Sequence, residues 1–223
     1  MTYPELVLKR KKYNLQIPGL INPSCYDDGK FDSDCYLEPW AKWQNSVPAE
    51  IMVIGQDWGG IDYYERNNGN DNSQNPTCRN LIRLFDVIKI NIGTPELPVN
   101  SGRVHFTNII PFLRTGQMQG DLNRILNQKL INEIAEHFTA PLISIVKPRI
   151  IITLGIAPLR AVLSIFKIKP QYQTLKKFVA CPPLTLDSEL YLFPMFHCGS
   201  SGVNRNRKME FQIEDWSRIL GML

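Results

Sequence analysis

Ile51-Met52-Val53-Ile54-Gly55-Gln56-Asp57-Trp58-Gly59-Gly60 is the stretch of this chain that decides its fold. An apolar run ends at Gly55, and two polar residues follow at once. Continuous apolar runs of this kind are typical of strands that are buried on both faces of a parallel sheet. Ligands of such sheets bind beyond the carboxyl ends of the strands. The stretch predicts a buried strand that places Asp57 at the mouth of a site, although a strand with an ordinary turn after it would read the same way.

Three further segments have the apolar, β-branched composition of buried strands, at residues 104–110, 149–154 and 190–196. Helical spacing of apolar residues predicts helices at 80–90, 122–138, 158–166 and 210–220, and the aromatic residues of 36–43 predict another. Strands that alternate with helices favour a parallel sheet covered on both faces. We therefore expect an α/β fold: a single domain over residues 1–223, with a central four-stranded parallel β-sheet flanked by helices on both faces. Residues 1–48 would be an irregular and helical N-terminal extension that packs on the core, and residues 67–76 a polar substrate loop or lid.

Composition narrows the class of protein. The chain has 223 residues, of which 43% are hydrophobic, but no apolar run approaches the ~20 residues of a membrane span. The first twelve residues lack the apolar segment of a signal peptide, so we expect a cytoplasmic protein that does not bind a membrane. The five cysteines are scattered (Cys25, Cys35, Cys78, Cys181 and Cys198). This pattern argues against a disulfide framework and a zinc ribbon. Distant cysteines that converge on an iron–sulfur cluster remain open, but we expect no metal and no cofactor.

The net charge of +4 is mildly basic, and its distribution is more informative than its size. Residues 9–12 form one basic cluster. Residues 205–208 form another, directly after a loop rich in glycine and serine. Clustered positive charge can neutralise phosphates, and an ordinary solvated surface is the alternative for each cluster.

Polar residues that could take part in catalysis or binding lie in or directly after three of the four predicted strands. Asp57 follows the first, Asn108 lies in the second, and His197 follows the fourth. Taken singly, the asparagine could cap a loop and the histidine could be satisfied at a strand end. The carboxyl ends of parallel strands share one edge of the sheet, so these three side chains are expected in one crevice.

These residues, in this order, resemble the uracil-DNA glycosylase superfamily over about residues 50–220. The matching pieces are Gly55-Gln56-Asp57, Thr107-Asn108, residues 148–155 with the helix after them, residues 197–205, and Asp215-Trp216. The resemblance implies that Asp57 positions or activates water and stabilises an oxocarbenium-like sugar. It implies that His197 stabilises the leaving base as an oxyanion-hole donor does, and that Asn108 reads the edge of a pyrimidine with Gln56 beside it.

The resemblance also implies that the target base flips out of the duplex. The loop after His197 would then press into the DNA. Its expected DNA contacts are Ser200, Ser201, Asn204, Arg205, Arg207 and Lys208, with Val203 as a weak wedge.

The chain departs from the family pattern at the pocket. The best-known uracil-specific members have Pro-Tyr-His after the aspartate, and their tyrosine excludes thymine, whereas this chain has Trp58-Gly59-Gly60. The missing wall would admit a substituent at the 5-position of the ring, unless Trp58, Tyr63 or Tyr64 refills the space. Thr77 stands roughly where the family has its stacking phenylalanine, and Tyr63 and Tyr64 are alternative stacking platforms. The family's His-Pro-Ser is replaced by His197-Cys198-Gly199-Ser200, and the cysteines do not match the iron–sulfur branch.

We therefore expect a monofunctional DNA glycosylase that acts as a monomer on DNA and needs no obligate protein partner. No lysine lies in a motif as a Schiff-base nucleophile. Its substrate would be uracil or a 5-substituted, even bulky, pyrimidine, in base-excision repair or in defence against modified viral DNA. A non-catalytic DNA-binding relative and a nucleosidase that acts on small molecules are the alternatives.

Overall fold

The computed structural model describes residues 1–57, 59–115 and 126–223. Its centre is a five-stranded sheet with the order β3-β2-β5-β7-β6. The strands are β2 (Ile51–Asp57), β3 (Val104–Ile110), β5 (Ile150–Leu154), β6 (Leu184–Asp187) and β7 (Leu190–Met195). The first four in this order run parallel, and β6 pairs with β7 antiparallel. The α/β class and the four parallel strands are confirmed, but the expectation of a four-stranded, all-parallel sheet is wrong, since the sheet is mixed.

The central strands are mostly apolar because both of their faces are covered, and the polar side chains of β2 lie at its carboxyl end. Ile51 and Val53 of β2 pack into one apolar cluster, whereas Met52 and Ile54 pack into another. All four are fully buried. Successive side chains of a strand point to opposite faces, so a strand covered on both sides has few polar positions.

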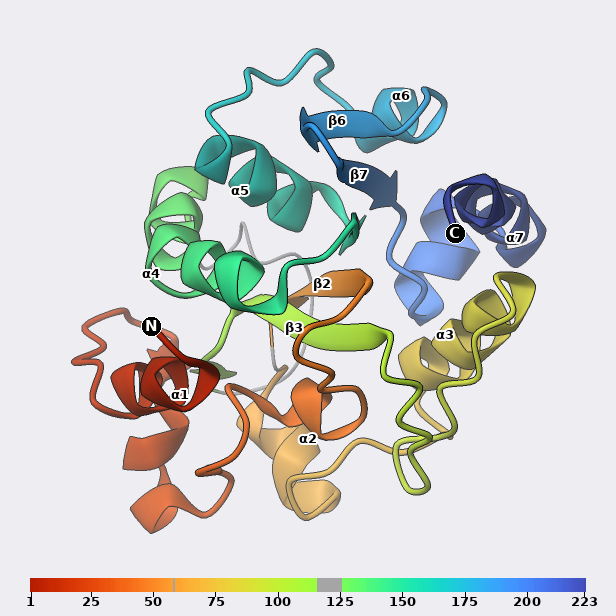
Figure 1. Cartoon of the computed structure of the whole chain (residues 1–223). Helices are drawn as coiled ribbons and strands as arrows, with labels where there is room; N and C mark the ends of the chain where they lie inside the picture. The colour runs from red at the N-terminus through yellow and green to blue at the C-terminus, as the bar shows by residue number, and fades with distance from the viewer. Residues whose placement is uncertain (58, 116–125) are drawn as a thin grey trace.

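Two groups of helices cover the two faces (Figure 1). α1 (Tyr3–Lys11), α4 (Gln128–Val146) and α5 (Ile156–Ile165) pack on one face, and α3 (Pro76–Val87) and α7 (Met209–Ser217) pack on the other. The short helices α2 (Ile61–Arg66) and α6 (Leu175–Val179) lie at the periphery of the sheet. Side chains of Asn75 and Asn127 cap α3 and α4 at their first turns.

Most predicted helices are present with shifted ends. α3 begins four residues before the predicted residue 80, because the Asn75 cap and Pro76 start it there. α4 runs on to Val146, beyond the predicted end at residue 138, and part of its predicted start lies outside the described residues. The helix expected at 36–43 is only the 3₁₀ helix η3 (Pro39–Lys42), and that expected at 210–220 is α7 followed by the 3₁₀ helix η6 (Arg218–Met222).

The N-terminal region is tied to the core. β1 (Leu20–Ile21) pairs with β4 (Leu113–Arg114), which directly follows β3. The 3₁₀ turns η1 (Pro23–Cys25) and η2 (Asp27–Gly29) follow β1. Residues of the N-terminal region therefore contact the core through the pairing of β1 with β4 and through the buried side chains of α1.

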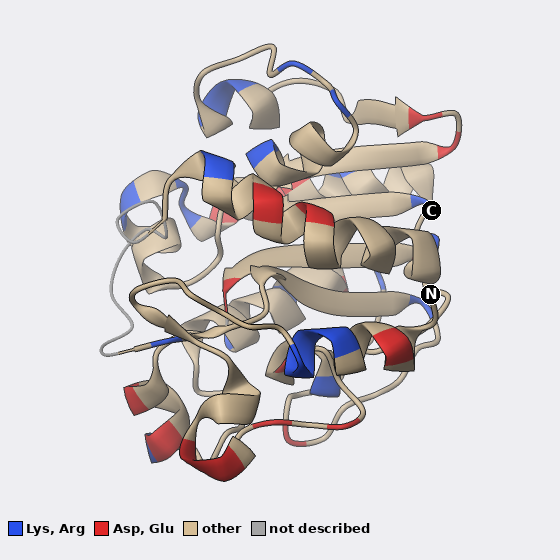
Figure 2. Ribbon diagram, turned by 90° about the vertical axis from the view of Figure 1, so that its left-hand side faces the viewer, with Lys and Arg blue, Asp and Glu red and all other residues tan. Residues whose placement is uncertain are grey.

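The basic cluster at the end of α1 holds this region together. Its residues form a blue band close to the N-terminus in Figure 2. Arg10 is fully buried and forms an ion pair with Asp32, and Lys11 lies 3.4 Å from the same carboxylate. Lys9 Nζ donates to the carbonyl oxygen of His137 at 2.8 Å. These pairs favour a structural role for the cluster over contact with nucleic acid.

Candidate functional site

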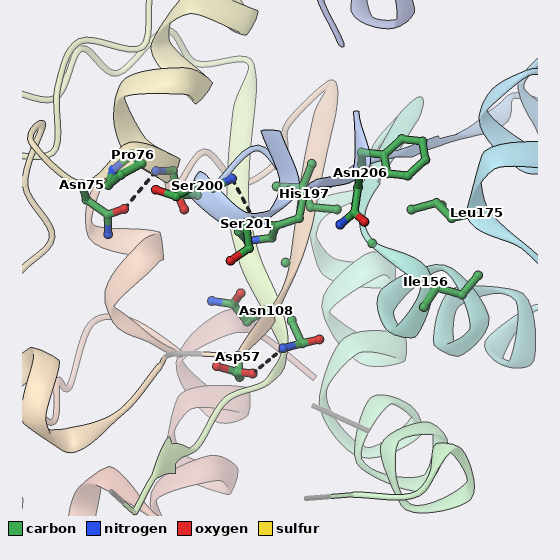
Figure 3. Close-up of a pocket in the computed structure, with 18 of the residues that line it drawn as sticks. Asp57, Asn75, Pro76, Asn108, Ile156, Leu175, His197, Ser200, Ser201 and Asn206 are labelled. Carbon is green, nitrogen blue, oxygen red and sulfur yellow. Dashed lines mark hydrogen bonds between the residues drawn. The ribbon is translucent and has the colours of Figure 1, made fainter. Parts of the chain in front are cut away.

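A cavity of about 1020 Å³ lies at the carboxyl ends of the parallel strands. Asp57, Asn108 and His197 all line it, so the three residues predicted from the strand ends lie in one place. In Figure 3, Asp57 and Asn108 lie together, and His197 faces them from the segment that follows β7. Gln56 lines the cavity beside Asp57.

The register of β2 and β3 brings Asn108 over Gly55. The two residues are paired across the strands, and a Cβ at position 55 would lie 2.3 Å from Asn108 Oδ1 and 2.9 Å from the ring of Trp40. Any side chain at this position would displace the amide of Asn108. Gly55 therefore makes room for Asn108 at the floor of the cavity.

Three donors hold the carboxylate of Asp57. Gln56 Nε2 donates to Oδ2 at 3.0 Å, and the backbone N–H of Gly59 donates to Oδ1 at 2.9 Å. Arg114 forms an ion pair with Oδ2, and both side chains are more than nine-tenths buried. A carboxylate offers about four lone-pair positions. These donors use two on Oδ2 and one on Oδ1, and no other donor among the described residues occupies the remaining position on Oδ1, which a water or a substrate can take.

Gly59 contributes its backbone to this arrangement. Its φ of +91° is in the region that favours glycine, and its carbonyl oxygen accepts a hydrogen bond from the backbone N–H of Arg114 at 2.9 Å. Gly59 and Gly60 are buried and do not line the cavity. Trp58, which we expected to contact the base, lies outside the described residues.

The imidazole of His197 is fixed by the loop that follows it. The backbone N–H of Gly199 donates to Nδ1 at 3.0 Å. In a neutral ring the proton must then lie on Nε2, which becomes the donor. His197 is exposed at the cavity, but the surrounding protein partly desolvates the imidazolium and lowers the pKa of His197, an effect that Asp57 opposes. The lowered pKa favours a neutral ring, and the hydrogen bond from Gly199 favours the tautomer that donates from Nε2.

A buried carboxyl group supports Asn108. Asn108 Nδ2 donates to Glu38 Oε2 at 2.6 Å. Glu38 is only 1% exposed and lies at the residue before η3. Burial raises the pKa of Glu38 to about 8, although the hydrogen bond from Asn108 and the backbone amide of Trp40 lower it.

The other wall of the cavity carries a polar network. Tyr63 Oη donates to Asp71 Oδ1 at 2.9 Å, and Asn75 Nδ2 donates to Tyr63 Oη at 2.9 Å. Burial raises the pKa of Asp71, although these two partners lower it. The candidate stacking residues Tyr63, Tyr64 and Thr77 all line the cavity, and Tyr64 is only 3% exposed.

The segment after His197 divides into two parts. Ser200, Ser201 and Arg205 are exposed and line the mouth of the cavity. Asn204 and Lys208 are exposed but lie away from it.

The contacts of Val203 and Arg207 do not favour the DNA-binding roles that we expected for them. Val203 is half-buried and packs against the apolar cluster of α3 and α7, which argues against its use as a wedge. Arg207 forms a two-pronged ion pair with Asp215 at 2.9 and 3.0 Å, so it anchors the segment to α7.

Sequence reasoning missed Glu38, Asp71 and Arg114. Glu38 and Arg114 are charged residues within or beside an aromatic or apolar stretch, whereas Asp71 lies in the polar loop 67–76. Charged residues are rarely buried unless they are paired. That signal could have marked Arg114, which follows a run of five apolar residues. It would not have named the partner of any of the three.

The described part of the chain contains no cluster of three or more histidine, cysteine or acidic side chains that could hold a metal ion. No helix within it is long and apolar enough to cross a membrane. No model of a known protein family matches the chain, and the comparison with curated proteins yields no match.

Proposed function

We propose that this chain is a monofunctional DNA glycosylase of the uracil-DNA glycosylase type, which hydrolyses the N-glycosidic bond of a flipped-out pyrimidine. One observation carries the proposal: Asp57, Asn108 and His197 lie around one cavity at the ends of three parallel strands. A carboxylate, an amide and an imidazole in this arrangement suit the three tasks of the reaction. These are delivery of water, recognition of the base, and stabilisation of the leaving base.

Asp57 serves the sugar side of the reaction. The lone pair on its Oδ1 that no donor in the described ranges uses can accept a hydrogen bond from a water and direct that water at the anomeric carbon. The ion pair with Arg114 keeps the carboxylate in place while positive charge develops on the sugar. Because Gln56 and Gly59 also hold it, no reorganisation is needed in the transition state.

His197 serves the leaving base. Negative charge grows on the carbonyl oxygens of a pyrimidine as its bond to the sugar breaks. The Nε2–H of a neutral His197 donates a hydrogen bond to such an oxygen, and the Gly199 amide fixes this tautomer. Removal of one donor of this kind from an enzyme typically lowers the rate by about 10²–10³-fold.

The size of the cavity favours a substituted pyrimidine. Its volume of about 1020 Å³ is at the upper end of the roughly 300–1,000 Å³ of ordinary ligand sites. Asp71 and Asn75 on its wall offer hydrogen-bonding partners for a polar group on the ring. The substrate we propose is uracil or a pyrimidine with a 5-substituent, excised in repair or in defence against modified viral DNA.

The mouth of the cavity suits a nucleic-acid backbone. Arg205 and the hydroxyls of Ser200 and Ser201 are exposed there. Side chains of these kinds provide most contacts to phosphate oxygens in protein–DNA complexes. A nucleosidase that acts on free nucleosides would not need these phosphate-binding side chains, because its substrates have no phosphate backbone.

An excision assay tests the proposal. The purified chain is incubated with duplexes that contain uracil, thymine, 5-hydroxymethylcytosine or glucosylated 5-hydroxymethylcytosine, and abasic sites are detected by alkaline cleavage. We expect cleavage of at least one substrate, its loss in D57N, and its retention in D62N, which alters an exposed aspartate on α2. DNA binding without abasic sites would indicate a non-catalytic DNA-binding protein. Activity on free nucleosides alone would indicate a nucleosidase.

A further inference from the structure

The contact between Asn108 and Glu38 has a consequence for the choice of base. The two ends of an asparagine amide have nearly the same shape, but one end accepts and the other donates hydrogen bonds. Here the amino end faces Glu38 Oε2 at 2.6 Å, and the oxygen lies over Gly55. An ionised carboxylate only accepts, so an ionised Glu38 permits this orientation and opposes the reversed one.

The orientation of the amide matters because the two kinds of pyrimidine present opposite edges. A cytosine-type base has an amino donor at position 4 and an acceptor at N3. A uracil-type base has an oxygen acceptor at position 4 and a donor at N3. An amide held one way round matches one of these edges, and the reversed amide matches the other.

We infer that Glu38 is a positioning residue that fixes the orientation of the Asn108 amide and thereby sets the preference of the site between 4-amino and 4-oxo pyrimidines. This inference rests on the proposed function. Glu38 does not line the cavity, so it acts on the base through Asn108. Its Oε1 has no hydrogen-bond partner among the described residues, although the backbone amide of Trp40 lowers the pKa of the carboxyl group.

The protonation of Glu38 offers a second way to alter the orientation of the Asn108 amide. The charged and titratable groups that act on Glu38 or are affected by its charge are Arg10, Asp71, Tyr3 and Tyr64. The pKa of Glu38 is raised to about 8 by burial. The neutral acid can donate as well as accept, so it tolerates both orientations of the amide. Selectivity is therefore expected to sharpen as the pH rises through about 8.

The test compares bases that differ only at position 4. Single-turnover excision rates are measured on matched duplexes with uracil or cytosine, and with 5-hydroxymethyluracil or 5-hydroxymethylcytosine. At pH 9, where Glu38 is ionised, E38Q should narrow the ratio of the two rates in a pair by about tenfold, because Gln at position 38 can donate or accept and a good two-point base contact gives discrimination of that order. The matched control is E50Q, whose glutamate pairs with Arg103 and Arg149 away from the cavity and should leave the ratio unchanged.

A second measurement needs no variant. In the wild-type chain the same ratio is measured from pH 6.5 to 9.5, and we expect it to widen with a midpoint near pH 8. This measurement tests the inference even if the E38Q variant fails to fold. Excision with a ratio that neither pH nor E38Q alters would overturn the inference and leave the proposed function intact. No excision of any base by the wild-type chain would overturn both.

Discussion

Arg114 and Asp57 form an ion pair at the carboxyl end of β2, with side chains only 3% and 6% exposed. The pair exists because β4 places Arg114 beside the loop that follows β2, where its backbone N–H also bonds to Gly59. The carboxylate on which the proposed chemistry depends is therefore neutralised and oriented by a residue from another part of the fold.

Replacement of Arg114 should destabilise the protein strongly. R114Q removes one partner of a buried pair and leaves the other charge uncompensated, which typically costs about 3–5 kcal/mol. Urea unfolding measures the change. The control is R103Q, whose arginine pairs with Glu50 but is 42% exposed, and which should cost about 1 kcal/mol or less. Equal losses in the two variants would contradict the importance of the buried pair.

Substitution of Gly199 should impair catalysis through His197. A Cβ at this position would lie 2.8 Å from Thr77 Oγ1 and 2.9 Å from His197 Cε1, so the imidazole must move. Because a displacement of about 1 Å in a catalytic group can lower a rate about 10²-fold, G199A should slow excision by one to two orders of magnitude. G221A, where no atom lies within 4 Å of the added carbon, is the control. A wild-type rate in G199A would show that the ring position is not critical.

His105 should make the fold sensitive to acid. Burial lowers the pKa of this fully buried histidine from 6.5 to about 4. Below pH 6.5 the unfolded chain binds a proton that the folded chain excludes, so the stability present above pH 6.5 is lost as the pH falls towards 4. The loss from this group amounts to about 3 kcal/mol.

Unfolding free energies at pH 7 and pH 4 check this prediction. H105F should show a smaller loss on acidification than the wild-type chain. H137N, which alters an exposed histidine on α4, should behave as the wild type does. An unchanged acid response in H105F would mean that other groups cause it.

The two basic clusters should differ in their effect on DNA binding. Arg205 is exposed at the mouth of the cavity, whereas residues 9–12 mostly hold the N-terminal region. R205A should reduce the slope of log affinity against log salt concentration by about one. K12A, which alters an exposed lysine at the end of α1, should leave the slope unchanged. The reverse result would place the DNA at the basic cluster of residues 9–12 instead of at the mouth of the cavity.

The sequence allowed most of the sheet to be predicted, because its central strands carry a strong local signal. β3 has the predicted bounds, since seven consecutive buried residues form it. The strand β6 was not predicted, because it has only four residues and its exposed alternate positions leave no continuous apolar run. A short, half-exposed strand at the edge of a sheet owes its conformation to its neighbour β7 more than to its own composition.

The candidate site could be predicted only in part for a similar reason. Asp57, Asn108 and His197 lie in or directly after strands, so the fold class alone brings them to one edge. Glu38 and Arg114 reach the same place through a 3₁₀ turn and through the pairing of β1 with β4. Pairings between distant short segments leave no periodic pattern in the sequence.

The distance along the chain between the paired side chains has a kinetic consequence. Glu38 and Asn108 are separated by 70 residues, and Asp57 and Arg114 by 57. Contacts between such distant residues form late, because the intervening loops must be closed first. A refolding chain would therefore acquire its helices, which depend on local contacts, before it acquires an oriented amide and a neutralised carboxylate. Recovery of activity should be the last signal to return, and it would report that the entire polypeptide, from the N-terminal extension onward, has reached its native arrangement.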